Sequence, residues 1–182
     1  DDLRHLRKEF HLPASPDGSQ ITYLVGHSLG LQPTRTASLV QEELDTWARS
    51  AVAGHFAEPR PWLSYHELLA EPLAELMGAL PTEVVAMNSL TVNLHLLMVS
   101  FYRPQGTRRK ILIEEHAFPS DHYAVASQIR LRRLDTSDAL ITLGPRAGEE
   151  TLRTDDIVAA IEAAGEELTL VMLPGVQYYT RQ

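Results

Sequence analysis

Hydrophobic residues follow two different spacings along this chain. Apolar side chains that recur every three to four residues predict helices, and short uninterrupted apolar runs predict strands. Helical spacing is found over residues 1–10, 34–51, 63–80, 89–102, 119–131 and 154–164. Apolar runs typical of strands occupy residues 21–25, 84–87, 110–114, 139–143 and 168–173.

Strands and helices alternate from Glu83 onward. This order is typical of a parallel sheet that helices cover on both faces. We therefore expect an α/β fold, in three α/β/α layers, with a mostly parallel sheet. Two helix starts are also marked. Pro72 should begin or kink a helix, and Thr154 should cap one, with Asp155 and Asp156 in its first turn.

Composition narrows the class of protein. The 182 residues are 44% hydrophobic and 22% charged, which is ordinary for a soluble globular protein. The formal net charge of -8 argues against a general nucleic-acid binder, which needs a basic surface. The absence of cysteine excludes disulfides, thiolate metal ligands and a cysteine nucleophile.

The two ends of the chain and its longest apolar runs indicate the cellular compartment of the protein and whether the chain is a segment of a longer one. No apolar run reaches the roughly 18 residues of a membrane-spanning helix, and the charged start lacks the apolar core of a signal peptide. We expect a cytoplasmic protein with no membrane partner. The first residue is not Met, and the last strand runs into a loop that ends at Gln182. We therefore expect a segment of a longer α/β protein.

Gly26-His27-Ser28-Leu29-Gly30 is a G-x-S-x-G motif that follows a predicted strand. In α/β-hydrolases this motif holds the nucleophilic serine on a sharp turn between a strand and a helix, which makes Ser28 a candidate nucleophile. The next residues, Leu31-Gln32-Pro33, do not continue as a helix, and only one short strand precedes the motif. A glycine-rich turn is the simpler interpretation, and a serine hydrolase is the alternative.

Asn88-Ser89-Leu90-Thr91 lies where a predicted strand meets an apolar helix. Free backbone N–H groups and the helix dipole make such a junction a phosphate site, to which Ser89 and Thr91 would add hydroxyl donors. The other interpretation is that the side chain of Asn88 or Ser89 caps the helix. The two interpretations are compatible.

Phe118-Pro119-Ser120-Asp121 comes just after the carboxyl end of the 110–114 strand. Ligands of open α/β sheets bind at that edge, where the Phe118 ring could stack on a flat heteroaromatic ring. Pro119, Ser120 and Asp121 also suit the first turn of a helix. An ordinary helix start, with Phe118 in the core, is therefore the alternative.

The chain contains eight histidines. His55 is a candidate for ligand contact because it lies in a predicted loop, Gly54-His55-Phe56; an exposed histidine without function is the alternative. His95 belongs to an apolar helix and is interpreted as a core or interface group. His116 and His122 flank the Phe118 segment without metal-ligand spacing, so no metal site is predicted.

Taken together, these segments resemble kynureninases. The similarity runs in order along nearly the whole chain. Its longest and most specific stretches are Leu-Thr-Val-Asn-Leu-His at 90–95 and Phe-Pro-Ser-Asp at 118–121. The matching segments are residues 26–33, 42–45 with Trp47, 54–56, 60–62, 87–95, 117–124, 148–153 and 174–180.

The resemblance implies a fold class and an activity. Kynureninases are fold-type I pyridoxal-phosphate (PLP) enzymes, built like aspartate aminotransferase, and they work as homodimers. They hydrolyse L-kynurenine or 3-hydroxykynurenine to anthranilate or 3-hydroxyanthranilate and L-alanine, in tryptophan catabolism. In such a fold, residues 1–50 would form an N-terminal segment with a long helix. Residues 51–182 would form the first part of the PLP-binding large domain.

The resemblance also implies roles for particular residues. The phosphate of PLP would be held by the backbone N–H of Leu90 and the hydroxyl of Thr91. Phe118 would stack on the pyridine ring, and Ser28 and His55 would lie beside the substrate. The residues implied to bind the cofactor are Leu90, Thr91, Phe118, Pro119, Ser120 and Asp121.

A PLP enzyme of this type needs a Schiff-base lysine. The two lysines, Lys8 and Lys110, do not stand in the family's lysine context, so we assign no catalytic residue in this chain. We expect the lysine beyond Gln182. The 182 residues alone should bind PLP weakly and should not turn over kynurenine, so a non-catalytic fragment is the second alternative function.

Three positions depart from the family's usual residues. His27 stands where Asn is usual, so a contact near the substrate would differ. Pro174 stands where some members have Ser near the cofactor phosphate, and Arg181 replaces a usual Gly.

Overall fold

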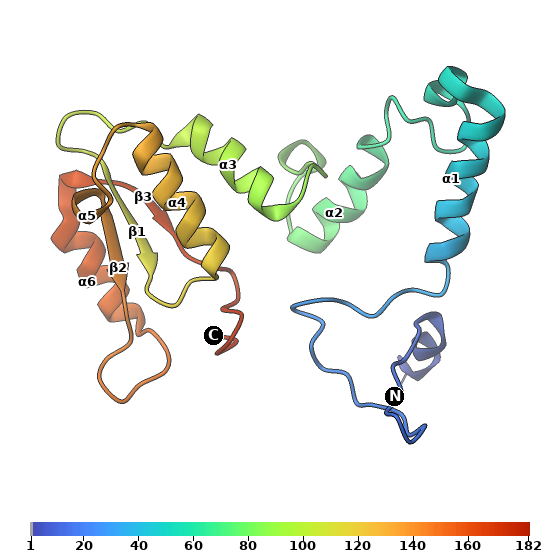
Figure 1. Ribbon diagram of the computed structural model, residues 1–182, viewed down its shortest axis with the longest axis horizontal. Coiled ribbons are helices and arrows are strands. Elements are labelled where there is room, and N and C mark those ends of the chain that lie inside the picture. The colour runs from blue at the N-terminus through green and yellow to red at the C-terminus, as the bar shows by residue number, and fades with distance from the viewer. Residues whose placement is uncertain (1) are drawn as a thin grey trace. The chain divides into compact units, whose positions relative to one another are not determined.

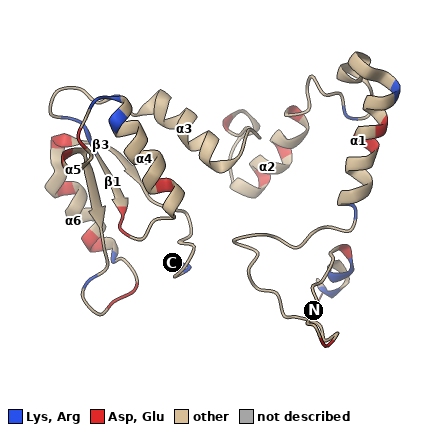
Figure 2. Cartoon of the chain, in the orientation of Figure 1, with Lys and Arg blue, Asp and Glu red and all other residues tan. Residues whose placement is uncertain are grey.

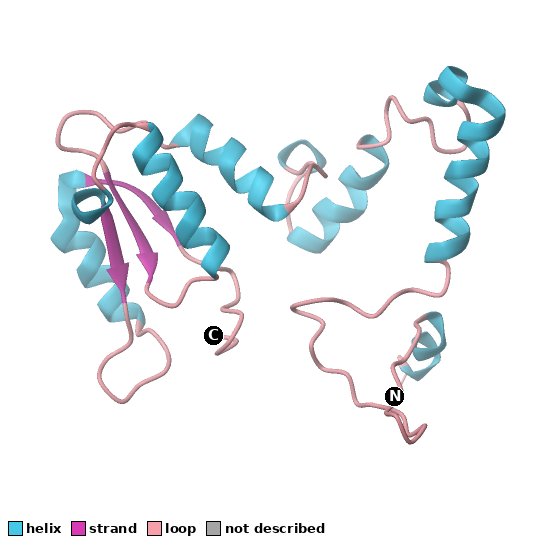
Figure 3. Cartoon of the chain, in the orientation of Figure 1, coloured by secondary structure: helices cyan, strands magenta, loops and turns pink. Residues whose placement is uncertain are grey.

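The computed structural model describes residues 2–182, and their contacts divide the chain into two compact units at Met87/Asn88. The strands formed by the described residues all belong to the second unit, while the first unit contains helices and loops (Figure 3). The expected domain boundary after residue 50 refers to the whole family fold and stays a prediction.

The first unit, up to Met87, is helical. Pro72 is the third residue of helix α2, where the missing N–H of proline removes no helical hydrogen bond, so the helix begins beside it as predicted. Gly78 ends α2 with a φ of 65°, a left-handed conformation that favours glycine. The elements are η1 (Arg4–Glu9), α1 (Thr36–Ser50), η2 (Ala51–Phe56), η3 (Glu67–Leu69), α2 (Ala70–Met77) and η4 (Pro81–Glu83).

Four predictions for the first unit need correction. The predicted loop Gly54-His55-Phe56 belongs to the 3₁₀ helix η2, because the chain makes a short helical turn after α1. Residues 21–25 and 84–87 form no strand. An extended segment becomes a strand only when a neighbour pairs with it in a continuous ladder, and among residues 2–182 the first run has only a single bond of this kind, from the Ile21 N–H to the Pro13 carbonyl at 3.1 Å. The helix predicted over 1–10 is the 3₁₀ helix Arg4–Glu9, and Asp1 lies outside the described residues.

The second unit is a small α/β assembly (Figure 1). Strand β1 pairs in parallel with β2 on one side and with β3 on the other, so the order in the sheet is β2-β1-β3. The predicted parallel sheet is thus confirmed. The elements are α3 (Leu90–Phe101), β1 (Lys110–Glu114), α4 (Pro119–Leu131), α5 (Thr136–Ala139), β2 (Leu140–Leu143), α6 (Thr154–Ala164), η5 (Gly165–Glu167) and β3 (Leu168–Met172).

The core of the second unit lies on both faces of β1. Successive side chains of a strand point to opposite faces. Ile111 and Ile113 pack with Val125 and Ile129 of α4, and Leu112, on the other face, is also fully buried. A central strand with both faces covered is what the continuous apolar run predicts.

Helices α3 and α4 lie side by side and run in the same direction. The amide of Gln128 on α4 contacts Nδ1 of His95 on α3 at 2.8 Å. Four residues further along each helix, the Arg132 guanidinium donates to the Val99 carbonyl at 3.2 Å. Since α4 starts just after the carboxyl end of β1, both helices begin at that edge of the sheet (Figure 1).

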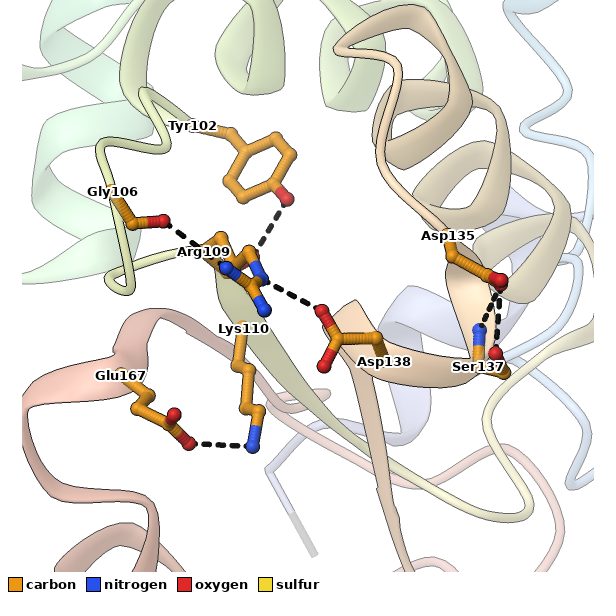
Figure 4. A network of polar contacts seen from close by, with 8 residues as sticks. All are labelled: Tyr102, Gly106, Arg109, Lys110, Asp135, Ser137, Asp138 and Glu167. Atoms are coloured by element: carbon orange, nitrogen blue, oxygen red, sulfur yellow. Dashed lines mark hydrogen bonds and ion pairs between the residues drawn. The ribbon is translucent and has the colours of Figure 1, made fainter.

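The opposite, amino edge of the sheet carries a network of ion pairs and hydrogen bonds (Figure 4). Nζ of Lys110 lies 2.6 Å from Glu167, and Nε of Arg109 lies 2.7 Å from Asp138. The hydroxyl of the buried Tyr102 donates to the Arg109 carbonyl at 2.8 Å. These contacts fix where β1 begins.

One helix start differs from its prediction. Thr154 is the first residue of α6 rather than its cap. Arg153 occupies the cap position in an extended conformation, and its carbonyl accepts from the N–H groups of Asp156 and Ile157. Asp155 and Asp156 lie in the first turn, as expected. Among residues 2–182, no helix is long and apolar enough to cross a membrane.

Candidate functional site

The carboxyl edge of the sheet gathers most of the predicted ligand-binding residues. Leu90 and Thr91 open α3, and the segment from Phe118 to Asp121 opens α4. Because α3 and α4 start at the same edge, the structure brings these two groups to one end of the second unit. Ser28 and His55 belong to the first unit.

Phe118 occupies the cap position immediately before α4. Its ring is 51% exposed and meets Tyr178 at a centroid distance of 5.1 Å and an interplanar angle of 87°. The interpretation of Phe118 as a core residue is therefore wrong. An edge-to-face contact on one side leaves ring surface free for a second aromatic group.

The start of α3 has the character of an anion site. Ser89 at the cap position makes no side-chain cap hydrogen bond, so the predicted Ser89 cap is not formed. The Asn93 amide instead donates to the Asn88 carbonyl at 3.0 Å, which holds the preceding loop against the helix. Leu90 and Thr91 are both exposed. The first N–H groups of the helix are thus open to a negatively charged ligand.

Asp121 lies in the first turn of α4, partly buried. Burial raises the pKa of its carboxyl above the ordinary value, while His122 and a hydrogen bond from Ser120 act in the other direction. His122 is itself held by a contact of 3.0 Å between its Nε2 and the Glu115 carbonyl. Asp121 therefore combines a negative charge with a poorly hydrated position at the site.

We expect Asp121 to titrate above about 3.9, the usual value for aspartate. Because its folded-state pKa is raised, the folded protein binds the proton more tightly than the unfolded chain. Its contribution to stability is therefore greatest below the unfolded pKa and is lost as the pH rises through the folded pKa. Carboxyl ¹³C NMR gives the midpoint, and the Asp121→Asn variant should lack this component. A midpoint at or below 3.9 would contradict the expectation.

His55 is held by a chain of contacts in the first unit. Its ring meets the Trp62 ring edge-on, with a centroid distance of 5.6 Å and an interplanar angle of 83°. Nε1 of Trp62 donates to Glu43 at 2.9 Å, and Nε of Arg60 donates to the same carboxylate at 2.6 Å. Gly54, just before His55, is buried under the Trp62 ring.

This arrangement fixes the orientation of Trp62 and, through it, one side of the His55 ring. The hydrogen bond from Arg60, followed by that from Trp62, lowers the pKa of Glu43, so this carboxylate stays ionised at neutral pH. His55 itself is exposed. Sequence reasoning assigned no role to Glu43, Arg60 or Trp62, and their only signal was that all three lie in segments that match kynureninases.

Ser28 lies in a turn rather than in a nucleophile elbow. Its N–H donates to the Val25 carbonyl at 3.0 Å, and the residue is exposed. No strand precedes it within the described residues, and the next α-helix begins only at Thr36. The strand–turn–helix geometry that activates a hydrolase serine is therefore not formed.

Lys110 is not placed for chemistry at the carboxyl edge. Lys110 begins β1 and is paired with Glu167 at the opposite edge of the sheet. Lys8 belongs to η1 in the first unit. Within residues 2–182, no group of three or more His, Asp or Glu side chains is arranged to hold a metal ion.

The amide side chain of Gln177 attaches the segment after β3 to the carboxyl edge. Gln177 is 5% exposed, and its Nε2 donates to the His116 carbonyl at 2.9 Å. Its Oε1 accepts from the N–H groups of Tyr179 and Thr180, at 2.6 and 2.8 Å. This anchoring places Tyr178 against Phe118. Sequence reasoning missed Gln177, because its partner lies 61 residues away.

Fold and site together define an α/β unit with a parallel sheet whose carboxyl edge offers an open helix N-terminus and an exposed aromatic ring. Proteins of this class bind anionic ligands with flat rings at that edge.

Known proteins that are similar to this chain include kynureninases. The chain is similar over all 182 residues to the kynureninases of Myxococcus xanthus, at 57% identity, Koribacter versatilis, at 52%, and Flavobacterium johnsoniae, at 48%. It spans 43% of the length of each of these curated relatives, their N-terminal portion. No family model matches the chain.

These identities confirm the resemblance to the N-terminal portion of kynureninases. They also confirm the fold class. Kynureninases are fold-type I PLP enzymes, and this chain forms a helix-rich α/β part of such a fold with a three-stranded parallel sheet.

Proposed function

We propose that this chain supplies the phosphate-binding and ring-stacking half of a kynureninase active site. The full protein would hydrolyse L-kynurenine, or its 3-hydroxy form, to anthranilate, or 3-hydroxyanthranilate, and L-alanine. The observation that carries the proposal is the similarity of the whole chain to kynureninases, with identities of 48–57% in the three relatives above.

The residues at the carboxyl edge fit PLP. The open start of α3 would hold the phosphate through the Leu90 N–H and the Thr91 hydroxyl, both exposed there. Phe118, half exposed beside Tyr178, would lie against the pyridine ring, and Pro119, Ser120 and Asp121 would form the adjoining wall. When bound, PLP supplies an electron sink for the bonds that change in the substrate.

The two candidates in the first unit would contact the substrate. Ser28 offers a hydroxyl on a turn, and His55 an imidazole whose orientation Trp62 restricts. We assign Ser28 to binding rather than to nucleophilic attack, because its turn lacks the elbow geometry. No residue of this chain is assigned as catalytic, and the Schiff-base lysine would belong to the part of a kynureninase that these 182 residues do not match.

For the full protein we propose the cellular compartment, pathway and oligomeric state of kynureninases. It would be a cytoplasmic PLP-dependent hydrolase of tryptophan catabolism, which also feeds NAD biosynthesis, and it would work as a homodimer. Light scattering of the full protein would test the dimer.

A chimera tests the proposed activity. In it, this chain replaces the matching N-terminal portion of the Myxococcus xanthus kynureninase, to which it is 57% identical. With PLP, we expect the chimera to release anthranilate from kynurenine and the 182-residue chain alone to release none. The unaltered relative is the control. A chimera that folds and binds PLP but releases no anthranilate would count against the proposal.

The same chimera tests the phosphate contact. Thr91→Val keeps the shape of the side chain and removes its hydroxyl. It should weaken PLP binding by about 10- to 100-fold, the range for a hydrogen bond to a charged group. Thr107→Val, the same change in the exposed turn before β1, should leave PLP binding as it was.

A further inference from the structure

A pocket of about 370 Å³ opens at the carboxyl edge of the sheet, apart from the residues proposed to hold PLP. Glu114 and Leu143, the last residues of β1 and β2, form its floor. The loop before α6 and the segment after β3 form its walls. The side chains that matter for its chemistry are Glu114, Glu149, Glu150, Leu152, Tyr178 and Tyr179.

Glu114 is the unusual member of this pocket. Its side chain is 7% exposed, yet its carboxylate has no hydrogen bond or ion pair with any described residue. Strand alternation places it on the face of Leu112, away from the core that β1 shares with α3 and α4. Its oxygens are not among the fully buried unpaired atoms of the described residues, so they reach the surface that lines the pocket. The pocket is the space into which this charge faces.

The two arginines that flank the pocket-lining loop before α6, Arg146 and Arg153, already have partners of opposite charge. Arg146 forms two hydrogen bonds with Asp156, at 2.8 and 2.6 Å. Arg153 forms two with Glu149. Figure 2 shows acidic residues at the end of β1 and in the loop after β2, and Glu114, Glu149 and Glu150 of these segments line the pocket. The pocket lining thus holds three carboxylates against one histidine, His116, which makes it acidic.

The apolar and aromatic side chains that line the rest of the pocket favour an organic ligand. Leu152 is buried, and Tyr178 and Tyr179 bring aromatic rings to the rim. Aromatic faces attract organic cations, and the volume is that of a small-molecule site. A bare metal ion is not favoured, because the described residues hold no group of three metal-ligating side chains.

We infer that this pocket binds a small organic amine in its ammonium form, with the ammonium group on Glu114 and the apolar body between Leu152 and the two tyrosines. The inference goes beyond the proposed kynureninase function and does not depend on it. Tyr178 lines the pocket and also contacts Phe118, which links the two regions.

Benzylamine is the probe, and benzyl alcohol is its neutral counterpart of the same shape. Binding to the 182-residue chain is followed by ¹H–¹⁵N NMR. We expect benzylamine to bind with a Kd on the order of 1 mM and to shift the amide signals of residues 114–116 and 177–180. Benzyl alcohol should bind at least about tenfold more weakly, since it cannot form the charged contact.

Two matched variants separate the pocket from general charge effects. Glu114→Gln should weaken benzylamine binding by about 10- to 100-fold. Glu115→Gln removes the same charge from the next residue, which is exposed and outside the pocket, and should leave binding unchanged. Equal binding of amine and alcohol to the unaltered chain would overturn the inference, even if Glu114→Gln failed to fold. Equal losses in the two variants would overturn it as well.

Discussion

Ile113→Ala is expected to lower the free energy of unfolding of the second unit by about 2–5 kcal/mol, the range for removing a large buried aliphatic side chain. Ile113 is fully buried in the cluster that joins β1 to α3 and α4. The vacated volume cannot collapse easily, because its neighbours Val125 and Ile129 are held by a helix of their own. Urea unfolding followed by far-UV circular dichroism measures the loss.

Ile21→Ala is the matched control for this change. Ile21 is 38% exposed and lies in a stretch without regular structure, so the same substitution should cost within about 0.5 kcal/mol. Equal losses at the two positions would mean that β1 is not the centre of a packed core.

Gly54→Ala is expected to destabilise the first unit by about 1–3 kcal/mol, as overpacking of a filled site does. A Cβ at Gly54 would lie 2.3 Å from the nearest atom of the Trp62 ring, so the ring must move away. Its hydrogen bond to Glu43 would then break, and His55 would lose the ring that restricts it. In a Trp47→Phe background Trp62 is the remaining tryptophan, and its fluorescence should shift to the red.

The control is Gly30→Ala. No atom lies within 4 Å of the Cβ that this change would add, and the φ of Gly30 lies outside the left-handed range. Stability and Trp62 fluorescence should therefore stay unchanged. An unaltered spectrum in Gly54→Ala would show that the Trp62 ring does not cover that glycine in solution.

In the second unit, the elements that have a clear local sequence pattern were predicted accurately. The strand over 110–114 and the helices over 119–131 and 154–164 have the predicted bounds. Each has a strong period or a clear boundary residue, such as Pro119 at the start of its helix. The strands predicted over 21–25 and 84–87 were wrong, because pairing depends on a neighbour that local pattern does not specify.

The candidate site also contains some residues that the sequence indicated and others that it did not. Motifs drew attention to Ser28, His55 and Phe118, and the comparison with known proteins supports the family that those motifs indicated. The supports of the site were not predictable. Trp62 reaches Glu43 across 19 residues, and Gln177 reaches the His116 carbonyl across 61. Only the folded chain shows which of these distant pairs meet.

The charged residues at the two ends of β1 differ in their ion pairs. At the start of the strand, Arg109 and Lys110 are paired with Asp138 and Glu167, whereas Glu114, four residues after Lys110, has no ion pair with any described residue. At about 3.3 Å per residue the two ends are roughly 13 Å apart, beyond the range over which substitutions usually influence one another. The pairs at Lys110 and Arg109 can therefore be re-engineered for stability without altering the carboxyl edge, where the proposed ligand contacts lie.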